Sequence, residues 1–401
     1  MIRATRTQWV KFAVVLALYL IFLVWLRSWL GLVVVPFIFD AYITKKIPWT
    51  WWRESKNRHV VTVMGWVDAI VFALVAVYFV NLYFFQNYVI PSSSLEKSLL
   101  TGDYLFVSKM SYGPRVPQTP LHMPLAQHTL PFFNCKSYLE HPQWDYKRVK
   151  GLGDVQLNDI VVFNFPAGDT VATGVPNDDI YRLSYGAGKE LAKPVDLASM
   201  TPEQQRVVYD YYYQLGREYL KENPQNFGEI ISRPVDRREN YVKRCVGLPG
   251  QTLEIKDRII YLDGKANKEP DNVQYRYLVK TKRPIPDDLA HELGISKEDM
   301  MMYYTDASVY NMPLTEKAKA GLLARKDIVV SIENTPADDA GGLYPLNMYK
   351  NWTTDNYGPV WIPKKGETVK LTIENLPVYE RPIHVYEGNE LAVKDGKIYI
   401  N

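Results

Sequence analysis

The sequence predicts N-terminal transmembrane helices followed by a mainly β domain with α/β insertions. Residues 1–90 are strongly apolar and rich in tryptophan. The residues that follow are polar and rich in tyrosine, and Gly and Pro divide them into short runs typical of strands. A stretch with helical spacing after Thr201 and a polar region over 268–365 interrupt this β pattern. A purely soluble enzyme is therefore excluded.

Apolar stretches predict a membrane anchor over residues 1–86. They run from Phe12 to Leu26, from Trp29 to Phe39 and from Val60 to Phe85. A helix that spans a bilayer needs about 20 apolar residues, and the third stretch is long enough. The first two are short, so they form either a tight hairpin or one long span broken near Arg27. The anchor therefore has two or three hydrophobic segments.

A basic loop between these stretches predicts the orientation of the chain in the membrane. Lys and Arg resist translocation, so this loop should be cytoplasmic, with its tryptophans at the level of the lipid headgroups. The residues after Phe85 should then lie on the extracytoplasmic face. Asp68 is expected to reach water near the cytoplasmic end of its helix. The loop contains Lys45, Lys46, Trp49, Trp51, Trp52, Arg53, Lys56 and Arg58.

Short strands and turns are predicted for the β domain over 87–267. The turn at Pro249-Gly250 suits a type II geometry, and Asp263-Gly264 is a strong hairpin signal. The predicted strands are Tyr104–Lys109, Ile160–Phe165, Tyr241–Val246, Thr252–Ile255 and Ile259–Leu262, the last two forming a hairpin.

Helices are predicted at two places within this β background. Thr201 can be an N-cap, followed by Pro202 in the first turn and by Gln204, which completes a capping box. A second short helix is expected near Thr315–Arg325. For the first helix, one apolar stripe is predicted to face the core: Val207, Val208, Tyr211, Leu215 and Tyr219.

We expect an inserted helical region at about 170–240, a large insertion at 268–365, and returning strands at 366–401. The last segment contains a weak repeat, because Leu253–Leu262 resembles Leu391–Ile400. In the second copy the chain ends at Asn401, where the first copy has the Asp of its turn. Such an edge would lack its partner strand, which natural sheets avoid, so we expect a truncated C-terminus.

Composition and motifs exclude several classes of function. The chain has 401 residues, with 47 Lys and Arg against 44 Asp and Glu. No nucleic-acid partner is expected, because such proteins carry a large basic excess. Cys135 and Cys245 are too few for a disulfide scaffold or a four-cysteine zinc module, and we expect two unpaired, buried thiols. The histidines show neither a Ser-His-Asp nor a metal-ligand pattern, and no phosphate-binding glycine motif is present. No metal or cofactor is expected.

Four motifs occur in order behind the last apolar stretch. They are the serine-containing block from Ile90, the Gly102-Asp103 pair, Asn158–Pro166, and Tyr241–Gly250 with its Lys-Arg-Cys-Val-Gly-Leu-Pro-Gly run. Each is weak alone, but together they resemble the bacterial type I signal peptidases, which are membrane-anchored enzymes that remove signal peptides from exported proteins. The resemblance implies a signal-peptidase-type β fold, a cytoplasmic membrane location, an extracytoplasmic catalytic domain, and preproteins as substrates.

The resemblance implies a Ser/Lys dyad, with Ser94 as nucleophile and Lys243 as general base. A lysine has an unperturbed pKa of about 10.4, so it serves as a base only where burial lowers that value. A drop of roughly 2 units corresponds to about 2.7 kcal/mol. The family pattern places the oxyanion donors at the Ser94 backbone N–H and the Ser92 hydroxyl.

The substrate is expected to add as a strand beside Tyr88-Val-Ile-Pro91. Shallow pockets would favour small residues at positions −1 and −3 of the signal peptide, because larger side chains clash. The positions that match the family's pocket-lining residues are Tyr88, Ile90, Leu95, Leu99, Tyr241 and Val242.

The sequence also departs from the family pattern. Lys97 replaces a proline, and no match exists for the final Gly-Asp-Asn-Arg block that helps to hold the dyad. The chain is then either a fragment, which we favour and expect to be poorly active by itself, or a degenerate homologue.

Structural interpretations of the same residues compete with catalysis. The cluster Ser92–Ser94 could be a polar linker, Lys243 a surface lysine, Arg244 a partner for a carboxylate, and Cys245 a small core side chain. The alternative function is a membrane-tethered, non-catalytic β domain. Its insertion at 268–365 would bind a secretion or cell-envelope partner.

Overall fold

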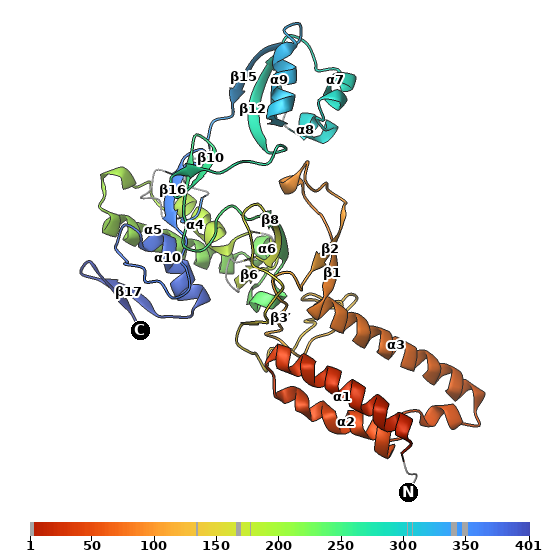
Figure 1. Ribbon diagram of the computed structural model, residues 1–401. Coiled ribbons are helices and arrows are strands. Elements are labelled where there is room, and N and C mark those ends of the chain that lie inside the picture. Colours follow the sequence, from red (N-terminus) through yellow and green to blue (C-terminus); the bar gives the residue numbers. More distant parts are fainter. Residues whose placement is uncertain are drawn as a thin grey trace. The chain divides into compact units, whose positions relative to one another are not determined.

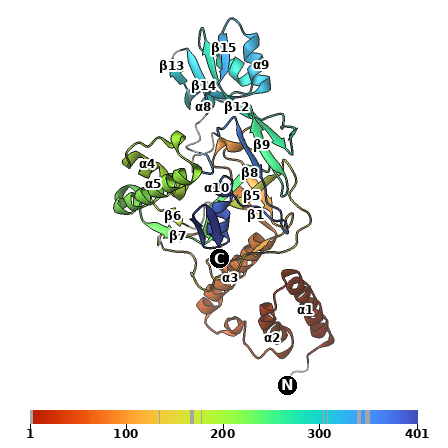
Figure 2. The same ribbon diagram turned by 90° about the vertical axis from the view of Figure 1, so that its left-hand side faces the viewer.

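The computed structural model describes residues 4–133, 135–165, 170–176, 178–302, 304–306, 308–337, 343–346 and 352–401 (Figures 1 and 2). Pro166, which ends one of the sequence motifs, and parts of the predicted 268–365 insertion lie outside these residues. The chain divides into two compact units. The first comprises residues 1–89, 104–155 and 236–238, and the second comprises 90–103, 156–235 and 239–401.

The first unit begins with a helical hairpin. Helix α1 (Arg6–Leu26) starts at a capping box on Thr5 and ends at Arg27, which adopts the left-handed conformation. The chain then returns through η1 (Leu30–Val34), α2 (Val35–Phe39) and η2 (Asp40–Thr44). The Tyr19 hydroxyl donates to the Gly31 carbonyl at 2.7 Å, and the Phe39 ring packs on Trp9 and Phe12. Of the two arrangements that the sequence allowed, the structure has the hairpin.

Helix α3 (Arg58–Tyr83) follows a short turn, η3 (Trp51–Glu54). By length and composition, α1 and α3 are the two helices in the described part of the chain that could cross a membrane. The expected apolar helices at the N-terminus are therefore confirmed. Asp68 on α3 lies 3.6 Å from Arg53, and both side chains are more than half exposed. Its carboxylate thus has an exposed cationic partner.

The rest of the first unit is short β structure. Strand β1 (Phe85–Val89) pairs antiparallel with β2 (Tyr104–Ser108), and β3 (Arg115–Val116) pairs with β4 (Lys147–Arg148). Asp236 fixes the 116–119 segment, because its Oδ2 accepts from the backbone N–H groups of Gln118 and Thr119 and from the Thr119 hydroxyl at 2.9 to 3.0 Å.

The second unit contains most of the strands, so the mainly β class is confirmed. Among the described residues of this unit, three strand pairs (β5-β8, β6-β7 and β17-β18) and two four-stranded sheets contribute, the sheets in the orders β11-β10-β9-β16 and β13-β14-β12-β15. The strands are β5 (Ile160–Asn164), β6 (Thr170–Ala172), β7 (Ile230–Ser232), β8 (Asn240–Arg244), β9 (Thr252–Lys256), β10 (Ile259–Leu262), β11 (Lys265–Ala266), β12 (Gln274–Thr281), β13 (Tyr304–Asp306), β14 (Val309–Thr315), β15 (Val329–Asn334), β16 (Tyr357–Trp361), β17 (Leu391–Lys394) and β18 (Lys397–Ile400).

Helices interrupt these strands. Figure 1 shows α4 and α5 side by side, and α9 against the sheet of β12 and β15. The helices are η4 (Ser93–Leu95), α4 (Ile180–Leu191), η5 (Leu197–Ser199), α5 (Pro202–Glu222), α6 (Pro224–Phe227), η6 (Val235–Arg237), α7 (Asp287–Glu292), α8 (Lys297–Met302), α9 (Glu316–Ala324), α10 (Leu376–Arg381) and η8 (Pro382–Tyr386).

The largest core lies in the region of β12 to β15. Strand β14 alternates between buried and half-buried residues, as expected for a sheet with one face against helices. The fully buried side chains there are Val279, Met312, Leu322 and Ile328. Helix α9 starts at Thr315, whose side chain accepts from the Ala318 N–H, and the predicted helix near Thr315–Arg325 is confirmed.

The turn chemistry read from the sequence also holds. Gly250 has a φ of +92°, which a type II turn requires at its third position. Asp263 and Gly264 both have positive φ and connect β10 to β11. The two copies of the internal repeat are both hairpins, β9–β10 and β17–β18.

Helix α5 has the predicted capping box on Thr201. The stripe predicted to face the core is wrong in part, because Val208 and Tyr219 pack against buried clusters but two other members do not. Val207 and Tyr211 are 69% and 58% exposed. The buried residues are instead Tyr212, Gly216 and Leu220. The reason is a close backbone contact with α4, which a count of apolar side chains does not detect.

That contact depends on two glycines. A Cβ at Gly216 would lie 1.7 Å from the Ser184 carbonyl oxygen, and a Cβ at Gly188 would lie 1.7 Å from the Tyr212 carbonyl oxygen. Side chains at these positions would force α4 and α5 apart.

The expectation of two unpaired, buried thiols is also wrong in part, because both cysteines are unpaired but Cys135 is exposed.

The α4–α5 contact gives the first prediction. Gly188→Ala should lower the free energy of unfolding by about 1 to 3 kcal/mol, because the added methyl group overpacks the helix interface. Gly186→Ala is the matched control on the same helix, since its Cβ would meet nothing within 4 Å. It should stabilise the helix by up to about 1 kcal/mol. Thermal unfolding of both variants checks this, and a shift of both melting temperatures in the same direction would contradict it.

Candidate active site

The Ser94 hydroxyl is carried by a loop whose two ends are joined. The Ile90 N–H donates to the Asp103 carbonyl at 3.0 Å, and the Gly102 N–H donates to the Ile90 carbonyl at 2.9 Å. Asp103 Oδ2 also accepts from the Leu100 N–H at 2.7 Å. Gly102 has a φ of +92°, so this turn favours glycine. Ile90 is buried at the base of the loop, while Ser94 is exposed in the short helix η4.

Strand β8 brings Lys243 to this loop. It pairs antiparallel with β5, and Lys243 lies opposite Val161. The Lys243 Nζ donates a hydrogen bond to the Ser94 Oγ at 2.6 Å. The two residues are 149 positions apart in the chain, so the fold, rather than local sequence, creates this contact.

The surroundings of Lys243 favour its neutral form. Its side chain is half-buried, and this burial lowers the pKa of Lys243 below its ordinary value. No carboxylate among the described residues forms an ion pair with it. The Tyr241 ring, whose centroid lies 5.8 Å from Nζ, would favour the charged form slightly. This cation–π effect is small, because an exposed contact of this kind contributes only about 0.5 to 1 kcal/mol.

The third polar residue near the dyad is Ser92. It has extended backbone geometry directly before η4, and its Oγ lies 3.5 Å from the Ser94 Oγ. The structure thus groups Ser92, Ser94 and Lys243 at one place in the second unit.

The predicted substrate-contacting residues are distributed over three elements. Pro91 is exposed and Leu95 and Leu99 are half-buried on the Ser94 loop, together with the buried Ile90. Tyr241 and Val242 lie on β8, where the Tyr241 ring stacks on Phe165 with centroids 4.7 Å apart.

Tyr88 lies on β1 of the first unit. Its hydroxyl donates to Gln86 Oε1 at 2.9 Å, and burial raises the pKa of Tyr88 to about 12. Its phenol is therefore neutral at physiological pH.

Arg244 holds the Ser94 loop against the strands, a role that the sequence did not indicate. Its Nη2 donates to the Ser98 Oγ at 3.0 Å and its Nη1 donates to the Asn158 carbonyl at 2.8 Å. The expected carboxylate partner was wrong, because the partners are a hydroxyl and a backbone carbonyl. The Cys245 carbonyl in turn accepts from the Asn158 N–H at 2.7 Å, so the Asn158 backbone is fixed on both sides. Ser98 was missed as a site residue, because a serine in a loop carries no signal of its own.

The backbone conformation of Lys97 explains why the family's proline is absent from this serine block. Its φ is +67°, in the left-handed region, whereas proline is locked near −65°. Proline could not occupy this position in the present loop. The backbone here therefore differs from that of a loop with proline at the same place.

A hollow of about 420 Å³ adjoins Ser94. It is lined by Ser93, Ser94, Leu95, Glu96, Ser98, Arg244, Pro270, Asn272, Val273, Gln274, Arg276, Asp299 and Pro313. No group of three or more His, Cys, Asp or Glu side chains that could hold a metal ion is found among the described residues.

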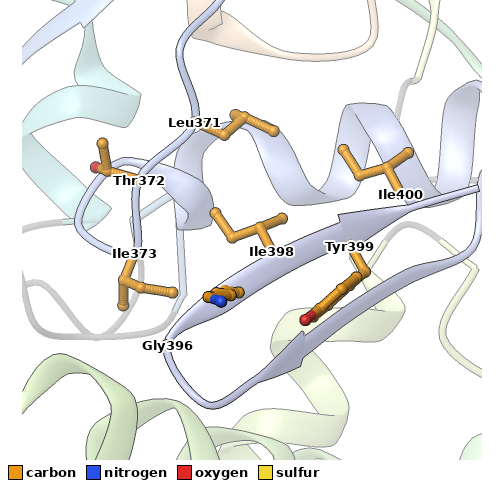
Figure 3. Close-up of a pocket in the computed structure, with 8 residues that line it drawn as sticks. Leu371, Thr372, Ile373, Gly396, Ile398, Tyr399 and Ile400 are labelled. Carbon is orange, nitrogen blue, oxygen red and sulfur yellow. The ribbon is translucent and has the colours of Figure 1, made fainter.

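A second, more open hollow of about 550 Å³ lies between Leu371–Ile373 and Gly396–Ile400 (Figure 3). In Figure 3, Ile398 and Leu371 flank it with apolar side chains. None of the predicted site residues lines it, so the candidate active site is the one at Ser94.

Comparison with known proteins finds relatives that are named as signal peptidases I. Signal peptidase I P of Bacillus subtilis subsp. natto is 20% identical over 279 residues, which cover 69% of this chain and 90% of that protein. Signal peptidase I of Rickettsia prowazekii (strain Madrid E) is 24% identical over 38% of this chain and 56% of that protein. Signal peptidase I of Helicobacter pylori (strain ATCC 700392 / 26695) is 42% identical over 56 residues, but the match spans only 14% of this chain and 18% of that protein.

No solved structure matches the chain significantly. The family described as "Signal peptidase, peptidase S26" matches residues 63–292, which include the Ser94 loop, β5 and β8. This match extends over more than half of the sequence. The chain therefore belongs to the signal peptidase family, peptidase S26, a family of hydrolases.

Proposed function

We propose that this protein is a membrane-bound serine endopeptidase that removes N-terminal signal peptides from exported preproteins with a Ser94/Lys243 dyad. The observation that carries the proposal is the 2.6 Å contact between the Lys243 Nζ and the Ser94 Oγ. A nucleophile and its base must lie within hydrogen-bond reach, and these two atoms do.

The first step transfers a proton from Ser94 to Lys243. The neutral amine accepts the hydroxyl proton as Oγ forms a bond to the scissile carbonyl carbon, and the carbonyl π electrons move to oxygen. When the tetrahedral intermediate collapses, the C–N bond breaks and the ammonium of Lys243 donates its proton to the leaving amine. The signal peptide remains as an ester on Ser94. The neutral lysine then deprotonates a water molecule, which hydrolyses this ester.

The oxyanion of the intermediate requires donors fixed close to the reacting oxygen. We assign this role to the Ser94 backbone N–H and the Ser92 hydroxyl. The 3.5 Å separation of the two serine Oγ atoms supports the assignment, because a carbonyl carbon attacked by the Ser94 Oγ would lie close to the Ser92 hydroxyl.

The signal peptide would bind as an added strand along Tyr88–Pro91. Tyr88 and Val89 are already extended in β1, which suits this mode. Half-buried side chains near Ser94 leave room only for small substrate residues before the cleaved bond. We propose that these side chains are Leu95, Leu99, Tyr241 and Val242, together with the buried Ile90.

Helices α1 and α3 would anchor the enzyme in the bacterial cytoplasmic membrane. Because the loop between the hairpin and α3 is basic, the positive-inside rule favours a cytoplasmic location for it. Because α3 then crosses the bilayer once before β1, the Ser94 loop would lie on the extracytoplasmic face. Exported preproteins present their signal peptides there.

The dyad gives a prediction that separates a base from a structural lysine. Lys243→Ala should lower kcat/KM for a preprotein by about 10²- to 10⁴-fold, the usual contribution of a general base. Lys243→Arg should lose as much, because a guanidinium can donate to Ser94 but cannot be deprotonated. Ser94→Ala should abolish the acyl-enzyme. Preprotein cleavage by the full chain in detergent measures all three.

The matched control is Lys256→Ala, an exposed lysine on β9 that pairs with Glu254. It should cleave at the wild-type rate. Cleavage retained in Lys243→Arg would refute Lys243 as the base. Absence of cleavage by the full-length gene product and by all of its variants would favour the non-catalytic β domain.

The direction of the Lys243 pKa shift predicts the pH dependence. Only the neutral amine accepts a proton, so kcat/KM should rise with pH through the pKa of Lys243. Burial lowers that pKa, so the midpoint should lie below the ordinary value of about 10.4. A pH–rate profile over roughly pH 6 to 10 checks this. A flat profile over that range would contradict the assignment.

Arg244 should act as a positioning residue. A lysine lacks the planar fork with which arginine reaches both Ser98 and the Asn158 carbonyl. Arg244→Lys should therefore lower kcat by about tenfold with little change in KM. In the Ser98→Ala background the same substitution should cost less, because the shared hydrogen bond is already lost. Fully additive effects would show that Arg244 acts independently of the nucleophile loop.

A further inference from the structure

The hollow beside Ser94 has a wall that does not come from the catalytic strands. Residues of the loop before β12, of β12 itself, of β14 and of α8 form this wall, all within the second unit. The Asn272 Nδ2 donates to the Lys97 carbonyl at 3.3 Å, which ties the wall directly to the nucleophile loop. The region that the sequence marked as an insertion therefore borders the reacting serine.

Asp299 on α8 is the unusual member of this wall. It is only 9% exposed, and its Oδ2 has no hydrogen-bond partner among the described residues. Its backbone N–H donates to the Ser296 Oγ at 3.1 Å, which fixes the start of the helix but leaves the carboxylate unpaired. Burying a carboxylate oxygen without a donor is costly, so an unpaired one calls for an explanation, such as a water, an ion or a ligand group that meets it.

The other charged groups of the hollow already have partners. Arg244 donates to Ser98 and to Asn158, and Glu96 lies 3.7 Å from the Lys97 ammonium. Arg276 is engaged in an interaction of its own. The atom in the hollow that lacks a hydrogen-bond partner is therefore an acceptor, the Asp299 Oδ2, and a positively charged donor complements it best.

The position of the hollow indicates which part of a preprotein reaches it. Residues before the cleaved bond are assigned to Tyr88–Pro91, and neither this segment nor Tyr241–Lys243 lines the hollow. Of the pocket-lining side chains proposed above, the hollow shares only Leu95. The part of the substrate that follows the cleaved bond must run away from Ser94 in a direction different from that of Tyr88–Pro91. The hollow can receive this part, because Ser94 is one of the residues that line it.

We propose that the hollow is a subsite for a lysine or arginine side chain among the first residues of the mature protein, with Asp299 as its acceptor. This inference rests on the proposed peptidase function. It makes the region between β11 and β16 a determinant of which preproteins are cleaved efficiently.

The test uses the full chain in detergent and reporter preproteins with alanine, lysine, norleucine or glutamate at the first, second or third mature position. Norleucine retains the length of lysine without its charge. At one position, kcat/KM for lysine should exceed that for norleucine by about tenfold or more, and glutamate should be cleaved most slowly. This comparison needs no variant protein. Equal rates for lysine and norleucine at all three positions would overturn the subsite.

Variants assign the effect to Asp299. Asp299→Asn should bring the lysine-to-norleucine ratio close to one, whereas Glu298→Gln, an exposed acid on the same helix, should keep the wild-type ratio. An unchanged ratio in Asp299→Asn would overturn the assignment. Lys243→Ala separates the two proposals. Persistent cleavage in that variant refutes the dyad, while loss of all cleavage together with equal wild-type rates refutes the subsite alone.

Discussion

The hydrogen bond between the Lys243 Nζ and the Ser94 Oγ is the interaction on which the site depends. It joins a strand to a loop that is remote in sequence. The amine is partly removed from water, and this burial lowers the pKa of Lys243. Burial alone shifts the protonation equilibrium toward the neutral form. Arg244 remains a permanent cation beside it, because a guanidinium keeps its proton. Adjacent basic residues on one strand thus make separate contacts, Lys243 with the Ser94 hydroxyl and Arg244 with the Ser98 hydroxyl and the Asn158 carbonyl.

The strand β8 illustrates how a short motif can build a site. Successive residues of a strand point to opposite faces, so Lys243 and Arg244 can engage different parts of the loop. Lys243 meets Ser94, and Arg244 meets Ser98 four residues later. The loop is held at its base by the contacts of Ile90 with Gly102 and Asp103. Its geometry is therefore fixed at several points before any substrate binds.

Much of this arrangement could be predicted from the sequence because its signals are local. Capping boxes, Asp-Gly turns and apolar stretches act over a few residues, and the ordered motifs identify Ser94 and Lys243. The buried face of α5 could not be predicted, because Gly216 has no side chain to count yet decides which face packs. The partners of Arg244 could not be predicted either, because they lie 86 and 146 positions away in the chain and no local pattern contains such contacts.

The positive φ of Lys97 has a consequence for exchanging parts between relatives. A proline introduced there alone would demand a backbone angle that the rest of the loop does not allow. The segment from Ile90 to Asp103, by contrast, closes on itself through its own main-chain contacts. The natural unit for building chimeric enzymes is accordingly the whole segment, transplanted with its turn intact, rather than any single residue within it.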